Sequence, residues 1–263
     1  MSSKYDRVAA DLRSKIRAGR FAPDTRLPAE TDLARDYGVT VNTMRRALEL
    51  LLQEGLIDKR QGAGNYVRQQ RPPMVRTTER YQWEKDRVRL PADERRAAGA
   101  TERDTGLNRD DLDFYAEYTQ IPATAEIAAV FNVPEGTRLL RRVYHTRKRS
   151  ERAPMGTGAS YLVYDHIARN PDLLNAENEP WPGGTQHQLS TVGIEVGEIV
   201  DEVVARTPTP DEALVLDIPS GSAVLVLRKI SIDTTGRVVE VADAIWPGSR
   251  IKLSYNTKLK AWN

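Results

Sequence analysis

The sequence predicts an α+β fold of two domains, a small helical module that ends in a hairpin and a larger body built on an antiparallel sheet. Helical periodicity followed by two short strands marks the first seventy residues. A unit of helix, turn and strand occurs twice in the second half of the chain. With 263 residues, the chain also exceeds the roughly 100–200 residues of a typical single domain.

The composition excludes several classes of chemistry. With no Cys, the chain cannot form a disulfide, a Cys-ligated zinc site, an iron–sulfur cluster or a thiol nucleophile. No window reaches the roughly 18 consecutive apolar residues of a membrane span, and the N-terminus lacks the apolar core of a signal peptide. These features predict a soluble, cytoplasmic protein, and we expect neither a metal site nor a cofactor.

The positive charge is concentrated near the N-terminus. Residues 1–71 carry 14 Lys plus Arg against 9 Asp plus Glu, a balance of +5, whereas the remainder carries 25 against 28, a balance of −3. This asymmetry is typical of a small module that meets a polyanion, attached to a body that does not.

Three helices are predicted in the first module. Apolar residues at steps of three and four predict a helix over residues 4–18, a short one over 29–36 and a third over about 41–54. Gly38 ends the second helix, and Thr40 is placed to cap the third. The outward face of the third helix then carries Asn42, Arg45, Arg46 and Glu49.

Two short strands follow, over about residues 56–60 and 65–68, joined by a glycine-containing turn over 61–64. Three helices and a hairpin in this order form a winged helix-turn-helix, in which the third helix enters the major groove of DNA. The alternative is that Arg45 and Arg46 are only a solvated helix face and that Gly62 serves only the turn.

The strings in this region closely resemble the DNA-binding domain of the GntR family of bacterial transcription regulators over about residues 4–68. They include Leu27-Pro28-Ala29-Glu30, Tyr37-Gly38-Val39-Thr40, Thr43-Met44-Arg45-Arg46-Ala47-Leu48 and Arg60-Gln61-Gly62-Ala63-Gly64. The resemblance implies a set of DNA-binding residues: Thr40, Val41, Asn42, Thr43, Arg45, Arg46, Gln61 and Gly62. Many relatives have Arg where this chain has Val41, so recognition should depend more on Asn42, Arg45 and Arg46.

A connector is predicted between the two domains. Residues 69–78 are polar and contain Pro72-Pro73, which predicts an extended linker. Residues 79–111 are strongly charged and lack a clean period, so we expect irregular structure or a mobile connector there. The predicted domains are residues 1–70 and 111–263, with the connector over 71–110.

The body contains an internal duplication. A strand over 113–119 and a helix over 123–131 precede the turn Pro134-Glu135-Gly136 and a strand over 139–146. The same helix, turn and strand recur over 209–216, 219–221 and 224–232, at an interval of 85 residues. A second strand follows each copy, over 154–163 and 238–246. This pattern predicts two related halves that pair into one antiparallel sheet.

This region resembles the UTRA ligand-sensing domain over about residues 110–258, which implies a chorismate-lyase-like fold and the HutC branch of the GntR family. The helical, metal-binding sensor that also accompanies this DNA-binding domain fits poorly, because strands dominate and His145, His166 and His187 are the only histidines. The aminotransferase-like branch would need several hundred more residues.

The resemblance also implies an effector cleft between the sheet halves. Arg142 and Glu240 match residues that bind sugar phosphates in relatives, whereas Tyr144, Gly158 and the Thr185-Gln186-His187 string depart from that pattern. Aromatic residues could line a more apolar pocket or be ordinary packing: Tyr144, Tyr161, Trp181 and Trp246. The candidate effector-binding set is Arg142, Tyr144, Tyr161, Thr185, His187 and Glu240.

These features together predict a homodimeric, DNA-binding repressor that a small-molecule effector releases from a pseudo-palindromic operator. Two alternatives remain: a chorismate-lyase-like enzyme whose DNA binding serves feedback, and a constitutive repressor without an effector. An enzyme is disfavoured because the sequence shows no catalytic triad order, phosphate loop or suggestively spaced carboxylate pair.

Overall fold

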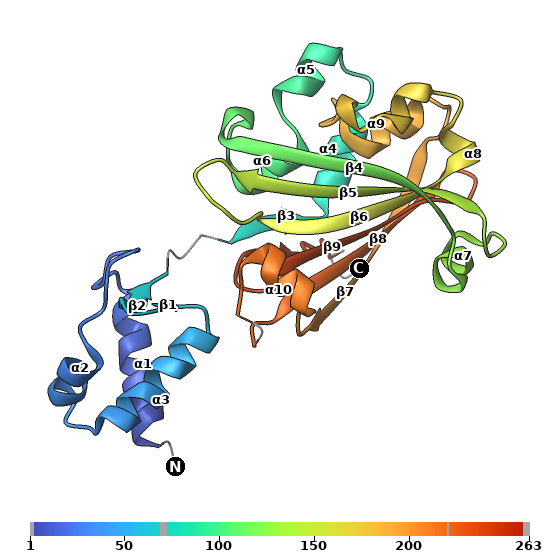
Figure 1. The fold of residues 1–263 in the computed structure, drawn as a ribbon. Helices are drawn as coiled ribbons and strands as arrows, with labels where there is room; N and C mark the ends of the chain where they lie inside the picture. Colours follow the sequence, from blue (N-terminus) through green and yellow to red (C-terminus); the bar gives the residue numbers. More distant parts are fainter. Residues whose placement is uncertain (1–2, 69–72, 220, 260–263) are drawn as a thin grey trace. The chain divides into compact units, whose positions relative to one another are not determined.

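The computed structural model describes residues 3–68, 73–219 and 221–259. The chain divides into two compact units, residues 1–72 with 207–223 and residues 73–206 with 224–263 (Figure 1). Among the described residues, no helix is long and apolar enough to cross a membrane.

The first unit contains the three helices and the hairpin that the sequence predicts. α1 (Lys4–Arg17), α2 (Glu30–Asp36) and α3 (Val41–Gln53) precede the antiparallel strands β1 (Ile57–Arg60) and β2 (Gly64–Val67). Every boundary lies within one or two residues of its prediction. The winged helix-turn-helix is therefore confirmed.

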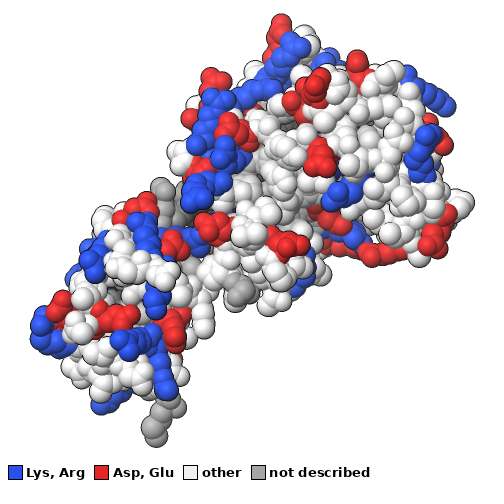
Figure 2. Space-filling view, viewed as in Figure 1, with Lys and Arg blue, Asp and Glu red and all other residues white. Residues whose placement is uncertain are grey.

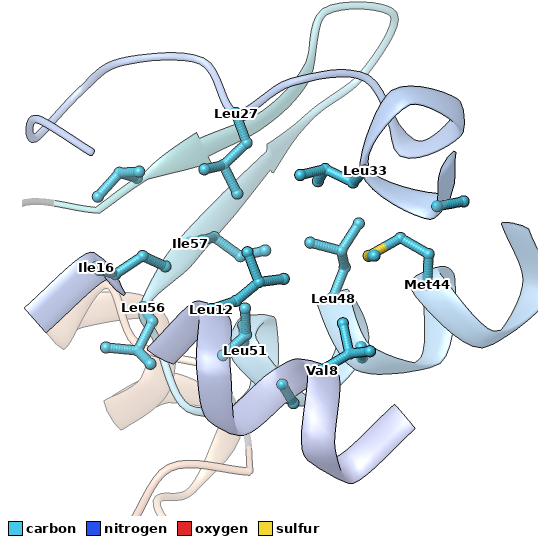
Figure 3. Close-up of a cluster of buried hydrophobic side chains, with 14 residues drawn as sticks. Val8, Leu12, Ile16, Leu27, Leu33, Met44, Leu48, Leu51, Leu56 and Ile57 are labelled. Atoms are coloured by element: carbon cyan, nitrogen blue, oxygen red, sulfur yellow. The ribbon is translucent and has the colours of Figure 1, made fainter. Parts of the chain in front are cut away.

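One hydrophobic cluster holds this unit together (Figure 3). Leu12 of α1 and Met44 and Leu51 of α3 have no exposed surface. Complete burial of such side chains stabilises a fold by about 1.5–3 kcal/mol each. The predicted inward stripes of α1 and α3 thus face each other, which leaves the opposite face of α3 in solvent.

The second unit is built on a six-stranded sheet whose neighbouring strands all pair antiparallel. In spatial order the strands are β4 (Leu112–Pro122), β5 (Arg138–Lys148), β6 (Gly156–Val163), β9 (Val238–Pro247), β8 (Val224–Asp233) and β7 (Val196–Arg206). The predicted antiparallel sheet is confirmed.

The strand order follows the duplication. The first half runs β4, α7 (Ala125–Phe131), β5, β6, and the second runs β7, α10 (Pro210–Leu216), β8, β9. The two halves meet where β6 pairs with β9. β7 was not predicted. A shift of β4 by the 85-residue interval of the duplication nevertheless coincides with β7 to within one residue.

Both faces of this sheet are covered. On one face α7 packs against a cluster that includes Leu139, Val163 and Val241. On the other, α8 (Tyr164–Ile167) and α9 (Gly184–Ser190) join a cluster with Leu140 and Leu162. Because successive strand residues point to opposite faces, residues 140, 142 and 144 of β5 share the face on which α9 lies.

The expectation of an irregular or mobile connector over 79–111 is wrong. The segment forms α4 (Glu79–Arg87), α5 (Ala92–Ala97) and α6 (Ala100–Thr105), which lie with α9 on one side of the sheet (Figure 1). Its helices lack an apolar stripe, and the one buried residue of α4 is Arg80. Long-range polar contacts hold it instead, such as the ion pair of Arg80 with Asp104. Periodicity could not reveal them.

The predicted extended linker is only partly described, because residues 69–72 lie outside the described residues. Beyond them, β3 (Met74–Thr77) is extended as expected but pairs in parallel with β10 (Ile251–Ser254). β3, the first strand of the second unit, is thus paired with a strand that lies far away in the sequence.

Leu51→Ala removes a fully buried side chain from the core of the first unit, so we expect it to lower the free energy of unfolding of that unit by about 2–5 kcal/mol. Glu49→Ala, at an exposed position of the same helix, should change it by less than about 0.5 kcal/mol. Urea titrations followed by circular dichroism measure both values. Equal losses would contradict the orientation of α3.

Candidate functional site

The amino end of α3 is built by Thr40 and Thr43. The Thr40 hydroxyl accepts a hydrogen bond from the Thr43 amide at 3.2 Å and lies 2.9 Å from the Thr43 hydroxyl. This N-cap satisfies a helix-start donor that would otherwise lack a partner. Val41 is half-buried and packs against the core cluster. These three predicted DNA-binding residues therefore also shape the start of the helix.

The exposed face of α3 carries Asn42, Arg45 and Arg46, as predicted. The Arg45 guanidinium, with 64% of its side chain exposed, is paired with Glu30 of α2 at 2.7 Å. An exposed ion pair contributes only about 0.2–1 kcal/mol, so Arg45 can exchange Glu30 for another partner at little cost. No ion pair joins Arg46 to any residue that the structure describes.

The turn between β1 and β2 places Gln61 and Gly62 in solvent. Gly62 has φ +71°, a conformation that favours glycine, and nothing lies within 4 Å of where a Cβ would stand. Next to the turn, the Arg60 guanidinium lies over the Tyr66 ring, 4.0 Å from its centroid. On the visible face of this unit, Lys and Arg side chains alternate with Asp and Glu (Figure 2).

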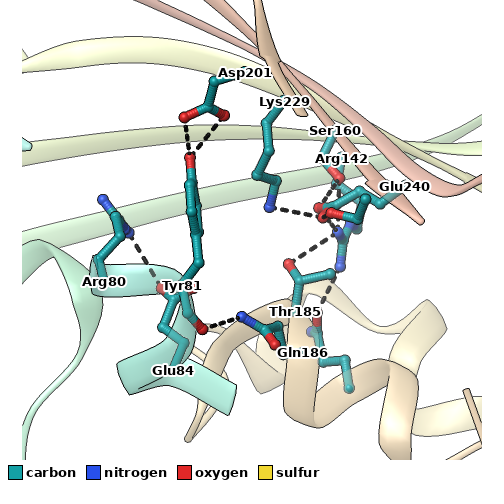
Figure 4. A network of polar contacts seen from close by, with 12 residues as sticks. Arg80, Tyr81, Glu84, Arg142, Ser160, Thr185, Gln186, Asp201, Lys229 and Glu240 are labelled. Carbon is teal, nitrogen blue, oxygen red and sulfur yellow. Dashed lines mark hydrogen bonds and ion pairs between the residues drawn. The ribbon is translucent and has the colours of Figure 1, made fainter. Parts of the chain in front are cut away.

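In the second unit, Arg142 of β5 is buried, with 1% of its surface exposed, at the centre of a polar cluster (Figure 4). Its Nη1 donates to Gln188 at 2.6 Å, and its Nη2 donates to Ser160 at 2.7 Å, Glu240 at 3.0 Å and Thr185 at 3.3 Å. The structure thus brings Arg142, Thr185 and Glu240 together. However, Arg142 and Glu240 contact each other directly at 3.0 Å, so no open cleft separates these two residues.

Glu240 is satisfied on both carboxylate oxygens. Besides Arg142, it accepts hydrogen bonds from Ser160 at 2.9 Å and Ser231 at 3.2 Å, and Lys229 lies 2.7 Å away. Burial by itself would raise the pKa of this carboxyl. The charges of Lys229 and Arg142 and the hydrogen bonds from Lys229 and Ser160 outweigh burial and lower the pKa to about 2. Glu240 is therefore ionised at neutral pH.

Tyr144 lies beside this cluster. Its hydroxyl is 3.2 Å from that of Tyr118 and donates to Glu179 at 3.1 Å. Gln188 donates to the same Glu179 oxygen at 2.9 Å, which links Tyr144 to the Arg142 cluster. Burial raises the pKa of Tyr144 well above its ordinary value, although Arg142 acts in the opposite direction. Tyr144 is thus a neutral hydrogen-bonding group.

The other predicted effector residues are dispersed. Tyr161 lies on the opposite face of the sheet, where it packs in the cluster beneath α7, so its assignment to the site is wrong. The one-residue shift from Ser160 reverses the side-chain direction. His187 accepts a hydrogen bond on Nδ1 from Trp181 Nε1 at 2.8 Å, and the pair lies apart from Arg142. Burial and then Arg95 lower the pKa of His187.

A cavity of about 260 Å³ opens next to the polar cluster. Tyr144, Thr185, Glu240 and Trp246 line it, as the sequence analysis expects of an effector site, whereas Arg142 lies behind it. The polar side chains at this cavity that were not predicted from the sequence include Arg76, Arg80, Asp104, Ser160 and Lys229.

Some of these residues had a signal in the sequence. Lys229 lies 85 residues after Tyr144, the interval of the duplication, so the two residues occupy equivalent positions in the two halves. The candidate site at Tyr144 could therefore have indicated Lys229. Arg76, Arg80 and Asp104 belong to the segment interpreted as a connector, and their contacts span up to 24 residues. No local pattern of the sequence could place them.

The floor of the cavity explains one departure from the sugar-phosphate pattern. At Gly158, an added Cβ would stand 2.7 Å from the Asp243 carbonyl oxygen of the neighbouring strand. The Glu that relatives are expected to carry at this position has no room here. Among the described residues, no group of three His, Cys, Asp or Glu is arranged to hold a metal ion.

Two family models match the chain. The model of bacterial regulatory proteins of the gntR family matches residues 4–67, and the model of the UTRA domain matches residues 157–252. The first match spans the three helices and the hairpin, and the second runs from β6 into β10.

Relatives align with nearly the whole chain. An HTH-type transcriptional regulator of Rhizobium meliloti is 28% identical over 96% of this chain and 94% of its own length. The histidine utilization repressor of Klebsiella aerogenes is 26% identical over 95% and 92%, and the transcriptional repressor NagR of Bacillus subtilis is 23% identical over 94% and 91%.

Solved structures share the fold. The crystal structure of a GntR-family transcriptional regulator is 25% identical, with a TM-score of 0.62, and covers 98% of this chain and 99% of its own. PhnF from Mycobacterium smegmatis is 20% identical with a TM-score of 0.52, over 96% and 100%.

Glu240→Gln tests the buried ion pair. Because the pKa of about 2 in the folded protein lies below the ordinary 4.5, ionised Glu240 contributes stability that is present above about pH 4.5 and is lost as the pH falls towards 2. At pH 7 we expect the variant to lose about 3 kcal/mol of unfolding free energy. The difference from the wild type should shrink at pH 3.5.

Urea unfolding at the two pH values measures this effect, with Glu198→Gln, at an exposed position of β7, as the matched control. A constant difference between wild type and Glu240→Gln at both pH values would contradict the lowered pKa.

Proposed function

Because this chain belongs to the GntR family of bacterial transcription regulators and carries the UTRA domain of its HutC branch, we propose that it binds operator DNA as a homodimer and is released by a small-molecule effector. The pairing of the two domains in one chain is the observation that carries this proposal. The chain is thus a DNA-binding, effector-responsive regulator and not an enzyme, in keeping with its relatives.

Repression is the proposed mode of action. Two relatives that align over more than nine-tenths of this chain are named as repressors. Release by an effector, rather than constitutive repression, is favoured by the cavity beside Arg142, whose volume of about 260 Å³ is close to the lower end of small-molecule sites, roughly 300 Å³. We assign DNA binding to residues 1–70 and effector binding and dimerisation to residues 111–263, and place the protein's action in the cytoplasm.

The exposed face of α3 is the proposed reading surface. Asn42, Arg45 and Arg46 offer amide and guanidinium donors of the kind that bind base edges and phosphates in the major groove. Val41 has no donor and is half-buried, so the operator should depart from the core sequence of relatives with Arg at this position. Gln61 and Gly62 lie at the exposed tip of the hairpin, where glycine permits close approach to the DNA backbone, and Thr40 and Thr43 present the helix start.

Selection of bound DNA from a random pool tests the proposal directly and supplies the operator. A protein that enriches no sequence would contradict sequence-specific binding. Genes next to matching sites in the source genome would then indicate the class of effector.

Arg45→Ala should weaken binding to the selected operator by about 1–3 kcal/mol, because the guanidinium is expected to contact a guanine. The loss should depend on the base at one position in each half-site, as gel-shift titrations of single-base operator variants would reveal. Arg17→Ala, at an exposed position of α1, is the matched control and should bind normally. Unchanged affinity of Arg45→Ala would place the reading surface elsewhere.

The footprint should be symmetric. A homodimer presents two recognition helices related by a two-fold axis, so its half-sites should form an inverted repeat with centres about one helical turn apart. Nuclease protection of the selected operator measures this arrangement. Protection of a single, asymmetric half-site would rule out the dimeric mode.

A further inference from the structure

We propose that the cavity beside Arg142 binds a small organic anion, held by Arg76 of β3 and Lys229 of β8, so that the effector carries a carboxylate or phosphate group. This inference rests on the proposed function, because it assigns the ligand chemistry of the same sensing unit. The site differs from the predicted one, in which Arg142 and Glu240 were the polar anchors.

Arg142 and Glu240 have little capacity left for a ligand. The Nη atoms of Arg142 are engaged by four side chains, and each Glu240 oxygen accepts hydrogen bonds or an ion pair. Both residues are almost fully buried. Their role is to hold the sheet together behind the cavity, which leaves ligand binding to the residues in front of them.

Every carboxylate that lines the cavity is already paired with a cation. The charged residues that line it are Arg76, Arg80, Lys229, Asp104, Glu240 and Asp243. Asp243 is paired at 2.8 Å with Arg228, and Glu240 is neutralised from behind by Arg142. The remaining carboxylate, that of Asp104, is ion-paired with Arg80, which also pairs with Glu84 at 3.2 Å. Arg76 and Lys229 are therefore the lining cations with donors left for an anion.

Lys229 keeps donors free. Its ammonium has three N–H groups, and Glu240 is its one ion-pair partner among the described residues. The side chain is only 16% exposed. A partly buried ammonium with unused donors is stabilised by an anion that replaces lost water.

Arg76 also has N–H donors without a hydrogen-bond partner among the described residues. One of its terminal nitrogens donates to the Tyr81 hydroxyl at 2.7 Å, and the other lies 4.0 Å from Asp104, beyond hydrogen-bond distance. Its Nε is buried without a hydrogen-bond partner in the described parts of the chain. The Tyr81 hydroxyl in turn donates a hydrogen bond to Asp201 at 2.7 Å (Figure 4). This chain of hydrogen bonds fixes the orientation of Arg76. The Arg76 guanidinium is therefore fixed in position and still has N–H groups that can donate to a ligand.

One wall of the cavity is largely apolar and suits a flat ligand. Trp246 stands against Gly156, where an added Cβ would lie 2.3 Å from the indole. Met74, Met155 and Tyr144 complete this wall. A ligand with one anionic group and a small ring or chain would place its charge between Arg76 and Lys229 and its body against Trp246.

Isothermal titration calorimetry on the full chain at pH 7 tests the proposal with three probes of similar shape: benzoate, phenyl phosphate and neutral benzamide. The anions distinguish a carboxylate effector from a phosphorylated one. We expect at least one of them to bind, and benzamide to bind at least about tenfold more weakly. Arg76→Gln and Lys229→Gln should each weaken the anion roughly ten- to hundredfold, the loss of one charge-assisted hydrogen bond.

Arg89→Gln and Lys252→Gln, the same substitutions at exposed positions, should bind the anion as the wild type does. Thermal unfolding without ligand shows whether each variant is folded. Equal binding of benzamide, no binding of either anion at about 10 mM, or unchanged affinity in folded Arg76→Gln and Lys229→Gln would overturn the proposal. Operator binding is measured on the same wild-type preparation, so a failed anion site and a failed DNA-binding function are distinguishable.

Discussion

The buried ion pair between Arg142 and Glu240 joins the two halves of the duplicated sheet. Arg142 and Ser160 belong to the first half and Glu240 to the second, so the pair crosses the seam where β6 meets β9. Two charges withdrawn from water cost several kcal/mol each unless every lone pair and proton is matched. Here Gln188, Thr185 and Ser231 supply further contacts, and among the described residues only the Nε of Arg142 is left without a hydrogen-bond partner in this pair. The position of α9, which carries Thr185 and Gln188, is therefore tied to the same cluster.

The contacts that hold this buried ion pair determine what the neighbouring cavity can do. Residues that satisfy a buried charge cannot also bind a ligand without exposing that charge, so the binding capacity moves outward to side chains with unused donors. The connector between the domains provides one of these, Arg76 of β3. The segment that follows the first unit in the sequence is thereby part of the wall of this cavity.

The fold of the first unit could be predicted because its information is local. The stripe of Leu12 and Ile16 and the cap at Thr40 each specify structure within a few residues. Most strands of the sheet could also be predicted, because the helix, turn and strand of each duplicated unit follow one another within a short stretch of sequence. α4 to α6 could not be predicted, because contacts such as that between Tyr81 and Asp201 join residues 120 positions apart. At the site, residue types were predictable, since Arg142 and Glu240 do come together. Their mutual pairing was not, because it depends on strand register.

The parallel pairing of β3 with β10 has a consequence for the order in which the protein is made. The first unit's helices and hairpin emerge from the ribosome early and can fold as N-terminal domains generally do. β3 follows directly, but β10 is synthesised after every other described strand. During translation, β3 therefore exposes an unpaired edge until almost the whole chain is complete. A nascent regulator can possess its helix-turn-helix well before its sensing unit is closed.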